Sequence, residues 1–229
     1  MENKLTSGQV TVLIPTYKRP EKLKRAVESI QNQSYQDFVI VISDNASGDE
    51  TENIVYSLIK GDTRIKYFKQ SLNIGMNPNF NFLVSKVDTP FFCLLTDDDY
   101  YLPNFLEDSI SFFNKYPQIM FSVMSAPEIN EAGDLLNDQL SKWPREGYFE
   151  KANSDIMKMV IDGNHPILTA CLFRSDIIQD FIFDPKIGAS SDVPLLYELL
   201  ANYPFAINKE KGLYFTKHED NLSAKNFSP

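Results

Sequence analysis

Cysteine, histidine and long apolar runs are scarce in this sequence. The two cysteines, Cys93 and Cys171, each lie inside a short apolar stretch, which is typical of buried thiols and not of a disulfide or a reactive site. No apolar run approaches the roughly 20 residues that span a bilayer. The first nine residues are polar and lack the apolar segment of a signal peptide. These absences predict a cytosolic protein.

Basic residues are also in the minority. The chain has 22 lysines and arginines against 31 aspartates and glutamates, a formal net charge of −9. We therefore expect no nucleic-acid partner and no strong electrostatic hold on anionic lipid, since both need a basic surface. A phosphorylated substrate is still compatible with this net charge, because a bound metal ion can make the local charge of a site positive. No Gly-x-Gly-x-x-Gly motif follows the first apolar run, which argues against a dinucleotide-dependent oxidoreductase.

Strand and helix patterns alternate in the first half of the chain. Hydrophobic residues make up 43% of the 229, enough for one large α/β domain or a domain with an appended subdomain. Strands are predicted at 10–14, 38–42, 65–68 and 91–95. Helices are predicted from Pro20, after a capping-box pair at Ser47 and Glu50, and at 78–87. Strands separated by helices predict a mostly parallel sheet.

Polar residues follow each of the four predicted strands. They are Thr16 and Tyr17, then Asp44, then Asn73 and Gly75, and finally Asp97, Asp98 and Asp99. Ligands of such sheets bind beyond the carboxyl ends of the strands. We therefore expect these side chains to line one cleft, although they are far apart in the sequence.

The three consecutive aspartates are the most informative of these groups. Carboxylates packed at the end of a buried strand repel one another and are costly to desolvate unless a cation shares their charge. Hard divalent ions such as Mg²⁺ and Mn²⁺ bind oxygen ligands of this kind together with substrate phosphates. The alternative is a solvated acidic turn ahead of a helix that begins near Pro103.

The pattern loosens after about residue 124. Residues 127–149 are polar and rich in turn residues, and we expect a long excursion from the core that is functional or mobile. Its Trp143 either covers a bound sugar or packs within a subdomain. Regular patterns then return as a predicted helix at 154–161, a strand at 168–173, a helix at 191–200 and a strand at 212–215.

Six short segments follow one another along the chain, and each is weak evidence of a family when taken alone. They are Val12–Arg19 (VLIPTYKR), Val41–Ser47 (VISDNAS), Asn73–Gly75 (NIG), Thr96–Asp99 (TDDD) with Pro103, Asp192 ahead of a leucine-rich helix, and His218 with Ser223. Together they resemble the family-two, inverting glycosyltransferases of GT-A type, which use nucleotide-sugar donors. The resemblance runs from Val10 to about Ser223.

The resemblance implies a fold. It is the GT-A fold, a Rossmann-like, mostly parallel nucleotide-binding sheet flanked by helices, with a smaller acceptor-side C-terminal region. Residues 1–124 would form the nucleotide-sugar-binding half and residues 125–229 the acceptor-binding half of a single domain.

The resemblance also implies which residues bind the donor. They are Pro15, Thr16, Tyr17, Arg19, Asp44, Asn73, Gly75, Thr96 and Asp97. Asp44 would accept a hydrogen bond from the base, and its alternative is an Asx turn that closes the strand. Arg19 would reach a phosphate, or it is a solvated charge at the helix start.

A metal site is implied by the family motif Asp-x-Asp with a proline five residues after its second acid. Counting back from Pro103 makes Asp98 that second acid and puts Thr96 at the first position, a departure from the pattern. The implied metal-site residues for Mn²⁺ or Mg²⁺ are Asp98, then Asp97 and Asp99, and also His218, which would lie near the metal and the diphosphate. Asp99 has the alternative of an acid at the helix start.

Asp192 matches the family's general base by its position at the start of a helix. A carboxylate there would take the proton of the acceptor hydroxyl. The alternative is a first-turn acid that stabilises the helix N-terminus.

The implied activity is metal-dependent, inverting transfer of a sugar from a nucleoside-diphosphate donor to a saccharide or lipid-linked saccharide. By extrapolation it serves bacterial polysaccharide or surface-glycan synthesis, in the cytoplasm or peripherally at the inner face of the membrane. Two alternatives are a sugar nucleotidyltransferase and a nucleotide- or carbohydrate-binding module with a degenerate site. Pro15-Thr16-Tyr17 lacks the glycine-rich, basic loop that the nucleotidyltransferase would prefer.

Overall fold

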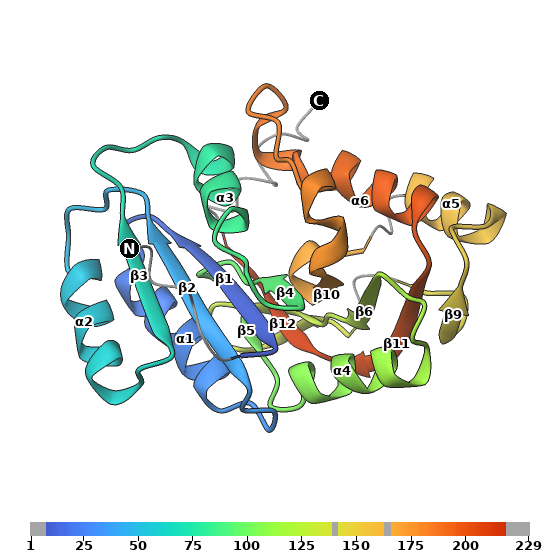
Figure 1. Ribbon diagram of the computed structural model, residues 1–229, viewed down its shortest axis with the longest axis horizontal. Coiled ribbons are helices and arrows are strands. Elements are labelled where there is room, and N and C mark those ends of the chain that lie inside the picture. The colour runs from blue at the N-terminus through green and yellow to red at the C-terminus, as the bar shows by residue number, and fades with distance from the viewer. Residues whose placement is uncertain (1–7, 139–141, 163–165, 219–229) are drawn as a thin grey trace.

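A mixed central sheet organises the molecule (Figure 1). The computed structural model describes residues 8–138, 142–162 and 166–218, so Ser223 lies outside the described residues. Within these ranges eight strands form the main sheet in the order β3-β2-β1-β4-β10-β6-β11-β9. Their bounds are β1 Val10–Thr16, β2 Phe38–Asp44, β3 Ile65–Lys69, β4 Phe91–Leu94, β6 Phe121–Ser125, β9 Gly147–Phe149, β10 Cys171–Arg174 and β11 Phe205–Lys211.

The four strands predicted in the first half are confirmed as a parallel group. β1 pairs in parallel with β2 and β4, and β2 pairs in parallel with β3. Thr16 is opposite Asp44 and Asp44 is opposite Lys69, so β1, β2 and β3 end level with one another. This register brings the polar residues that follow these strands to a single edge of the sheet.

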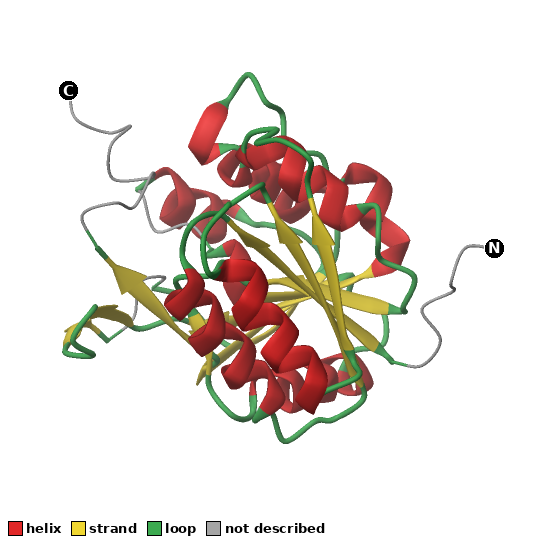
Figure 2. Ribbon diagram, turned by 90° about the vertical axis from the view of Figure 1, so that its left-hand side faces the viewer, coloured by secondary structure: helices red, strands yellow, loops and turns green. Residues whose placement is uncertain are grey.

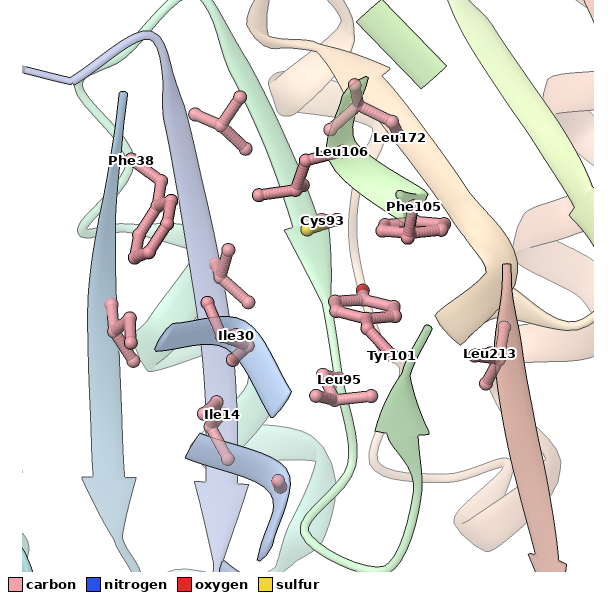
Figure 3. Packing of buried hydrophobic residues seen from close by; sticks show 14 of the residues in the cluster. Ile14, Ile30, Phe38, Cys93, Leu95, Tyr101, Phe105, Leu106, Leu172 and Leu213 are labelled. Carbon is pink, nitrogen blue, oxygen red and sulfur yellow. The ribbon is translucent and has the colours of Figure 1, made fainter. Parts of the chain in front are cut away.

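Helices cover both faces of the sheet (Figure 2). They are α1 Pro20–Gln31, α2 Thr51–Gly61, α3 Met76–Val84, α4 Phe105–Lys115, α5 Ser154–Ile161 and α6 Asp192–Asn202. Alternate residues of β1 face opposite sides, as the period of a strand requires. Val12 and Ile14 pack with residues of α1, α2 and α4, and Leu13 packs with residues of α3, α5 and α6. Figure 3 shows the first of these two cores, in which Ile14 and Cys93 of the sheet lie among Ile30 of α1 and Phe105 of α4.

The second half of the chain extends the same sheet. β10 runs antiparallel to β4 and to β6, and β11 runs parallel to β6. The strand predicted at 168–173 is wrong in its first part, because Leu168–Ala170 forms a 3-10 helix and the strand is Cys171–Arg174. β11 had no counterpart in the sequence prediction. The proposed boundary at residue 124 falls within β6.

A second, smaller sheet lies beside the main one. Its order is β5-β12-β7-β8, with bounds β5 Tyr100–Tyr101, β12 Leu213–Lys217, β7 Glu128–Asn130 and β8 Leu135–Asn137. The expected excursion at 127–149 therefore contains the β7–β8 hairpin and then β9, which pairs with β11 at the edge of the main sheet. Trp143 is buried in the core and packs as an ordinary interior side chain.

Two local predictions are corrected. The capping box is wrong, because α2 begins at Thr51 after Glu50, and Ser47 is engaged elsewhere in the turn after β2. The third helix is α3 at Met76–Val84, which starts and ends earlier than the predicted 78–87. Within the described part of the chain, no helix combines the length and apolarity needed to cross a membrane.

Candidate active site

A pocket of about 670 Å³ opens at the carboxyl ends of β1 to β4. One side, which we name the sheet wall, consists of the turns after these strands. Its lining residues are Pro15, Thr16, Tyr17, Arg19, Asn45, Asn73, Gly75, Met76 and Thr96–Asp99. A second group of lining residues, which we name the helix wall, consists of Ile167–Thr169 around the 3-10 helix and Ser191–Asp192 at the start of α6. Asn79, Phe80, Leu94 and Phe215 complete the lining.

Asn45 ties the turns after β2 and β3 together. Its Oδ1 accepts a hydrogen bond from the Ile74 amide at 2.9 Å. Its Nδ2 donates to Asn73 Oδ1 at 3.0 Å and to the Gly75 carbonyl at 3.2 Å. Gly75 adopts φ +90, a backbone conformation that a glycine takes without steric cost. One asparagine thus fixes the part of the sheet wall that faces Tyr17.

Asp97 is bound by residues from the end of β1. Its Oδ2 accepts a hydrogen bond from Thr16 Oγ1 at 2.8 Å, and its Oδ1 lies 3.2 Å from Arg19 Nη1. Burial raises the pKa of Asp97 to about 6, and the charge of Asp98 adds to that rise against the opposing effects of Arg19 and Thr16. Because the partners come from a different turn, Asp97 joins two segments of the sheet wall.

Asp98 is the carboxylate best able to stay ionised. Its Oδ2 lies 2.9 Å from Arg19 Nη1 and 2.8 Å from His218 Nε2. Burial opposes its ionisation, but the hydrogen bond with His218 and the charge of Arg19 outweigh burial and lower the pKa of Asp98. Arg25 of α1 also donates from Nη2 to the Asp98 carbonyl at 2.5 Å. Of the three acids of the turn, Asp98 is therefore the one whose pKa is lowered.

Asp99 faces the protein interior and both of its oxygens are engaged. Oδ1 accepts from the Thr216 amide at 2.9 Å, and Oδ2 accepts from Thr96 Oγ1 at 3.0 Å and Thr169 Oγ1 at 3.2 Å. Burial and the charge of Asp98 raise the pKa of Asp99 to about 8. These contacts fasten the acidic turn to β12 and to the 3-10 helix.

The side chain of Asp44 closes the turn after β2, as its alternative interpretation expected, but through Ser47, three residues on, where an Asx turn would use the residue two positions on. Its Oδ1 accepts from the Ser47 amide at 2.8 Å and from Ser47 Oγ at 2.6 Å, and its Oδ2 accepts from the Tyr67 hydroxyl at 2.8 Å. Asp44 is 1% exposed and is absent from the pocket lining. Ser47 Oγ in turn accepts from the Lys18 amide at 2.8 Å. Lys18 has φ 57, so this contact supports a left-handed turn that carries Tyr17 and Arg19.

Asp192 is the first residue of α6 and lines the pocket on the helix wall. Its neighbour Ser191 is 2% exposed and donates from Oγ to Asn77 Oδ1 at 3.0 Å. The prediction that an acid stands here at a helix start is confirmed by the bounds of α6, which place Asp192 in its first turn.

The donor atoms around Asp98 suit a hard divalent ion in part. A carboxylate oxygen and an imidazole nitrogen lie 2.8 Å apart. The carboxylate suits Mn²⁺ and Mg²⁺, whereas the imidazole is a ligand more typical of transition-metal ions. Among residues 8–138, 142–162 and 166–218, no group of three or more histidine, cysteine, aspartate or glutamate side chains could hold a metal ion unaided. The chain offers a partial ligand set of the kind that substrate phosphates and water complete.

The structure brings most of the predicted site residues together. Pro15, Thr16, Tyr17, Arg19, Asn73, Gly75, Thr96–Asp99 and Asp192 line the pocket, and His218 contacts Asp98 beneath it. Asp44 does not reach the pocket. The sequence analysis missed Asn45, Thr169 and Phe215. Asn45 follows Asp44 in the same turn and was open to detection, whereas Thr169 and Phe215 depend on long-range packing.

Similar proteins were found by sequence. A family model described as glycosyl transferase family 2 matches residues 11–175, more than half of the chain. A Campylobacter jejuni protein named GalNAc(5)-diNAcBac-PP-undecaprenol beta-1,3-glucosyltransferase is 27% identical over 217 residues, which cover 94% of this chain and 67% of that protein. An uncharacterized glycosyltransferase of Methanocaldococcus jannaschii is 28% identical over 215 residues, 92% of this chain and 71% of that protein.

Solved structures share the fold. Residues 1–349 of S. aureus TarS, in complex with UDP, superpose with a TM-score of 0.74 at 18% identity over 94% of this chain. The mannosyltransferase PcManGT from Pyrobaculum calidifontis, in complex with GDP-Man and Mn²⁺, gives 0.67 at 13% identity over 96% of this chain. The chain spans 62% and 61% of those two structures. It belongs to glycosyl transferase family 2 and is a glycosyltransferase with the GT-A fold.

Proposed function

We propose that this protein transfers a sugar from a nucleoside-diphosphate donor to a hydroxyl acceptor, with inversion at the anomeric carbon and with the help of Mn²⁺ or Mg²⁺. The observation that carries the proposal is the pocket itself. It sets one ionised carboxylate, Asp98, beside Arg19 and His218 on one wall, and a second carboxylate, Asp192, on the other. A leaving diphosphate and an attacking hydroxyl need these two kinds of group on opposite sides of the sugar.

The sheet wall is proposed to bind the donor. Tyr17, Asn45 and Asn73 would surround the base, and Thr16 and Asp97 would contact the ribose. Arg19 carries a charge that the diphosphate can use, and it lies at 28% side-chain exposure in the pocket. Asp44 is proposed to act indirectly, because its oxygens already bind Ser47 and Tyr67. Its contribution would be to hold the turn of Tyr17 and Arg19.

Asp98 and His218 are proposed to hold the divalent ion together with oxygens of the donor diphosphate. When bound, such an ion stabilises the negative charge that develops on the leaving diphosphate. Asp97 would support it from the neighbouring position. Asp99 was predicted as a third ligand, but its oxygens accept hydrogen bonds from Thr96, Thr169 and Thr216. We therefore propose that Asp99 holds the acidic turn in place.

Asp192 is proposed as the general base. It would take the proton of the acceptor hydroxyl as the hydroxyl oxygen attacks the anomeric carbon and the bond to the diphosphate breaks. Its position in the same pocket as Asp98, but on a different element, supports this role. Positioning of the two reactants by the two walls would supply much of the remaining rate enhancement.

The acceptor and the place of action are proposed from the relatives. The Campylobacter jejuni relative is named for an acceptor linked through PP to undecaprenol. A lipid-linked saccharide acceptor in surface-glycan synthesis is accordingly proposed here, at the cytoplasmic face of a membrane. Residues 1–124 would serve the donor and residues 125–229 the acceptor, since Asp192 and the 3-10 helix come from the second group.

A thermal-shift panel of UDP, GDP, ADP and CDP, each with and without Mn²⁺, tests the proposal. Ligand binding raises the apparent melting temperature by mass action, so at least one nucleotide should give a shift that Mn²⁺ enlarges. Asp98→Asn should abolish the enlargement by Mn²⁺. Asp134→Asn, an exposed acid of the β7–β8 hairpin, serves as a matched control and should behave as wild type.

A turnover assay separates the enzyme from a binding module with a degenerate site. Nucleotide sugars of the base that gives the shift are incubated with the protein and a panel of saccharide acceptors, with water as the default acceptor, and release of the nucleoside diphosphate is measured. The proposal expects release that depends on Mn²⁺. Binding of the nucleotide without any release would favour the binding module.

A further inference from the structure

A buried asparagine of α3 connects the two walls of the pocket. Asn77 is 3% exposed and is absent from the pocket lining. Its Nδ2 donates to the Asp184 carbonyl at 2.8 Å and to the Gly188 carbonyl at 3.0 Å. Two carbonyl acceptors fix the orientation of the amide, because only nitrogen can donate to them. Oδ1 is left to accept the hydrogen bond from Ser191 Oγ at 3.0 Å.

Ser191 occupies the capping position of α6 but does not cap the helix. A serine at this position usually accepts from an amide of the first turn with its own hydroxyl. Here α6 has no side-chain cap, and the hydroxyl donates instead to Asn77. A contact across the protein has therefore replaced a local one, directly before Asp192.

We propose that Asn77 is a positioning residue that sets where Asp192 stands in the pocket. The inference rests on the proposed role of Asp192 as the base. Asn77 holds three points of the segment that leads into α6, at Asp184, Gly188 and Ser191. In Figure 1 this segment is the orange chain beside α3. Loss of the Asn77 side chain frees the segment and moves the carboxylate relative to the sugar.

The tether begins in the sheet wall. Asn77 is the second residue of α3, and α3 follows Gly75, whose carbonyl accepts from Asn45. A single short helix thus links the loop proposed to bind the donor with the carboxylate proposed to activate the acceptor. A shift of about 1 Å in a reacting group costs on the order of 10²-fold in rate, so this link affects turnover more than binding.

Asn81 provides a matched control one helical turn later. Its Nδ2 donates to the Phe183 carbonyl at 2.9 Å, and its Oδ1 accepts from the Phe183 amide at 2.9 Å. It therefore binds the same segment with the same chemistry, but it does not contact Ser191. A purely structural role for Asn77 predicts that Asn77→Ala and Asn81→Ala behave alike.

The test compares Asn77→Ala with Asn81→Ala, and the readout is release of the nucleoside diphosphate. The substrate is the nucleotide sugar that wild type turns over fastest, chosen from UDP-glucose, UDP-N-acetylglucosamine, UDP-galactose and GDP-mannose. We expect kcat to fall about 30-fold in Asn77→Ala, with KM within about twofold of wild type, and to fall less than about threefold in Asn81→Ala. Ser191→Ala should reproduce most of the kcat loss, and Ser191→Thr, which keeps the hydroxyl, should restore it.

Hydrogen exchange gives a readout that does not depend on activity. Asn77→Ala should speed exchange of amides at the start of α6, and Asn81→Ala only of those near Phe183. Equal kcat losses in the two variants, or equal exchange at the start of α6, would overturn the inference. If Asp192→Asn turns over like wild type, the proposed base is wrong, and that result is distinct from failure of the tether. If wild type releases no nucleoside diphosphate, the proposed function and the inference fall together.

Discussion

The two walls of the pocket are held in place by different means. The sheet wall is built from turns that follow parallel strands in register, and hydrogen bonds join neighbouring turns through Asn45, Thr16 and Arg19. The helix wall comes from a 3-10 helix and the first residues of α6, and its position relies on contacts across the protein. Asn77 and Asp99 make the main contacts of this kind.

The difference explains how binding and transfer can be separated in one pocket. The sheet wall is pre-organised by the fold and should bind a nucleotide whatever happens at α6. The helix wall carries the proposed base. Substitutions there should therefore lower turnover without lowering the affinity for the nucleotide. A substitution in one wall should therefore leave the property of the other wall nearly unchanged.

Asp192→Asn should give the largest effect. Removal of a general base lowers kcat by about 10²- to 10⁴-fold. The dissociation constant for the nucleoside diphosphate should be within about twofold of wild type, since Asp192 lies on the helix wall. Initial rates of nucleotide release and calorimetric binding measure the two quantities. Turnover comparable to wild type would remove Asp192 from the mechanism.

Asp98→Asn should give a loss of about 10²-fold in kcat/KM, because the charge that the proposed metal and Arg19 share is removed. Nucleotide binding should lose its dependence on Mn²⁺ in the same variant. Steady-state kinetics over a range of Mn²⁺ concentrations are the measurement. An unchanged Mn²⁺ dependence would place the metal elsewhere.

Asn45→Ala should weaken the sheet wall alone. The variant loses three hydrogen bonds, to Ile74, Asn73 and Gly75, and each stabilises the turns by a net free energy of about 1 kcal/mol. Part of this lost free energy should appear as a roughly tenfold rise in KM for the donor. kcat should change less than about threefold, because the three hydrogen bonds of Asn77 to the segment before α6 do not involve Asn45. Asn53→Ala, an exposed asparagine of α2, is the control. A kcat loss larger than the KM change would contradict the separation of the walls.

We expect the role of Asp99 to depend strongly on its hydrogen bonds and hardly at all on its charge. Its raised pKa indicates a carboxyl that is easily protonated, and an amide of the same shape can serve the three threonines. Asp99→Asn should therefore lower kcat/KM by only about threefold. Asp99→Ala removes the carboxyl oxygens that accept from the Thr216 amide and from the Thr96 and Thr169 hydroxyls, and it should reduce the free energy of unfolding by about 3 kcal/mol. Urea unfolding curves measure the second effect, and equal stability of both variants would refute this role.

Much of the sheet wall was visible in the sequence. β1, β2 and β4 are apolar runs followed by turn residues, and a parallel arrangement of the strands gathers their ends at one edge of the sheet. The helix wall was harder to predict. An apolar run such as Leu168–Phe173 does not separate a strand from a 3-10 helix by periodicity. Three of the seven residues of β11, Lys209–Lys211, are exposed and charged, which hid that strand.

Individual contacts were predicted least well. Asp44 matches a family motif that favours a base contact, and the sequence also fits an Asx turn. The positions of Ser47 and Tyr67 show that its oxygens are engaged within the turn and by β3. His218 reaches Asp98 because β12 pairs with β5, directly after the acidic turn. Asn77 lies 114 positions before Ser191, and no local pattern records such a partner.

The most direct test of the account is calorimetric titration of wild type, Asp98→Asn and Asp192→Asn with the nucleoside diphosphate that gives the largest thermal shift, with and without Mn²⁺. The account predicts that Asp192→Asn binds as wild type does and that Mn²⁺ strengthens both, whereas Asp98→Asn binds more weakly and ignores Mn²⁺. Equal weakening of the two variants, or binding that neither substitution changes, would contradict a pocket with one wall for the donor and one for the acceptor.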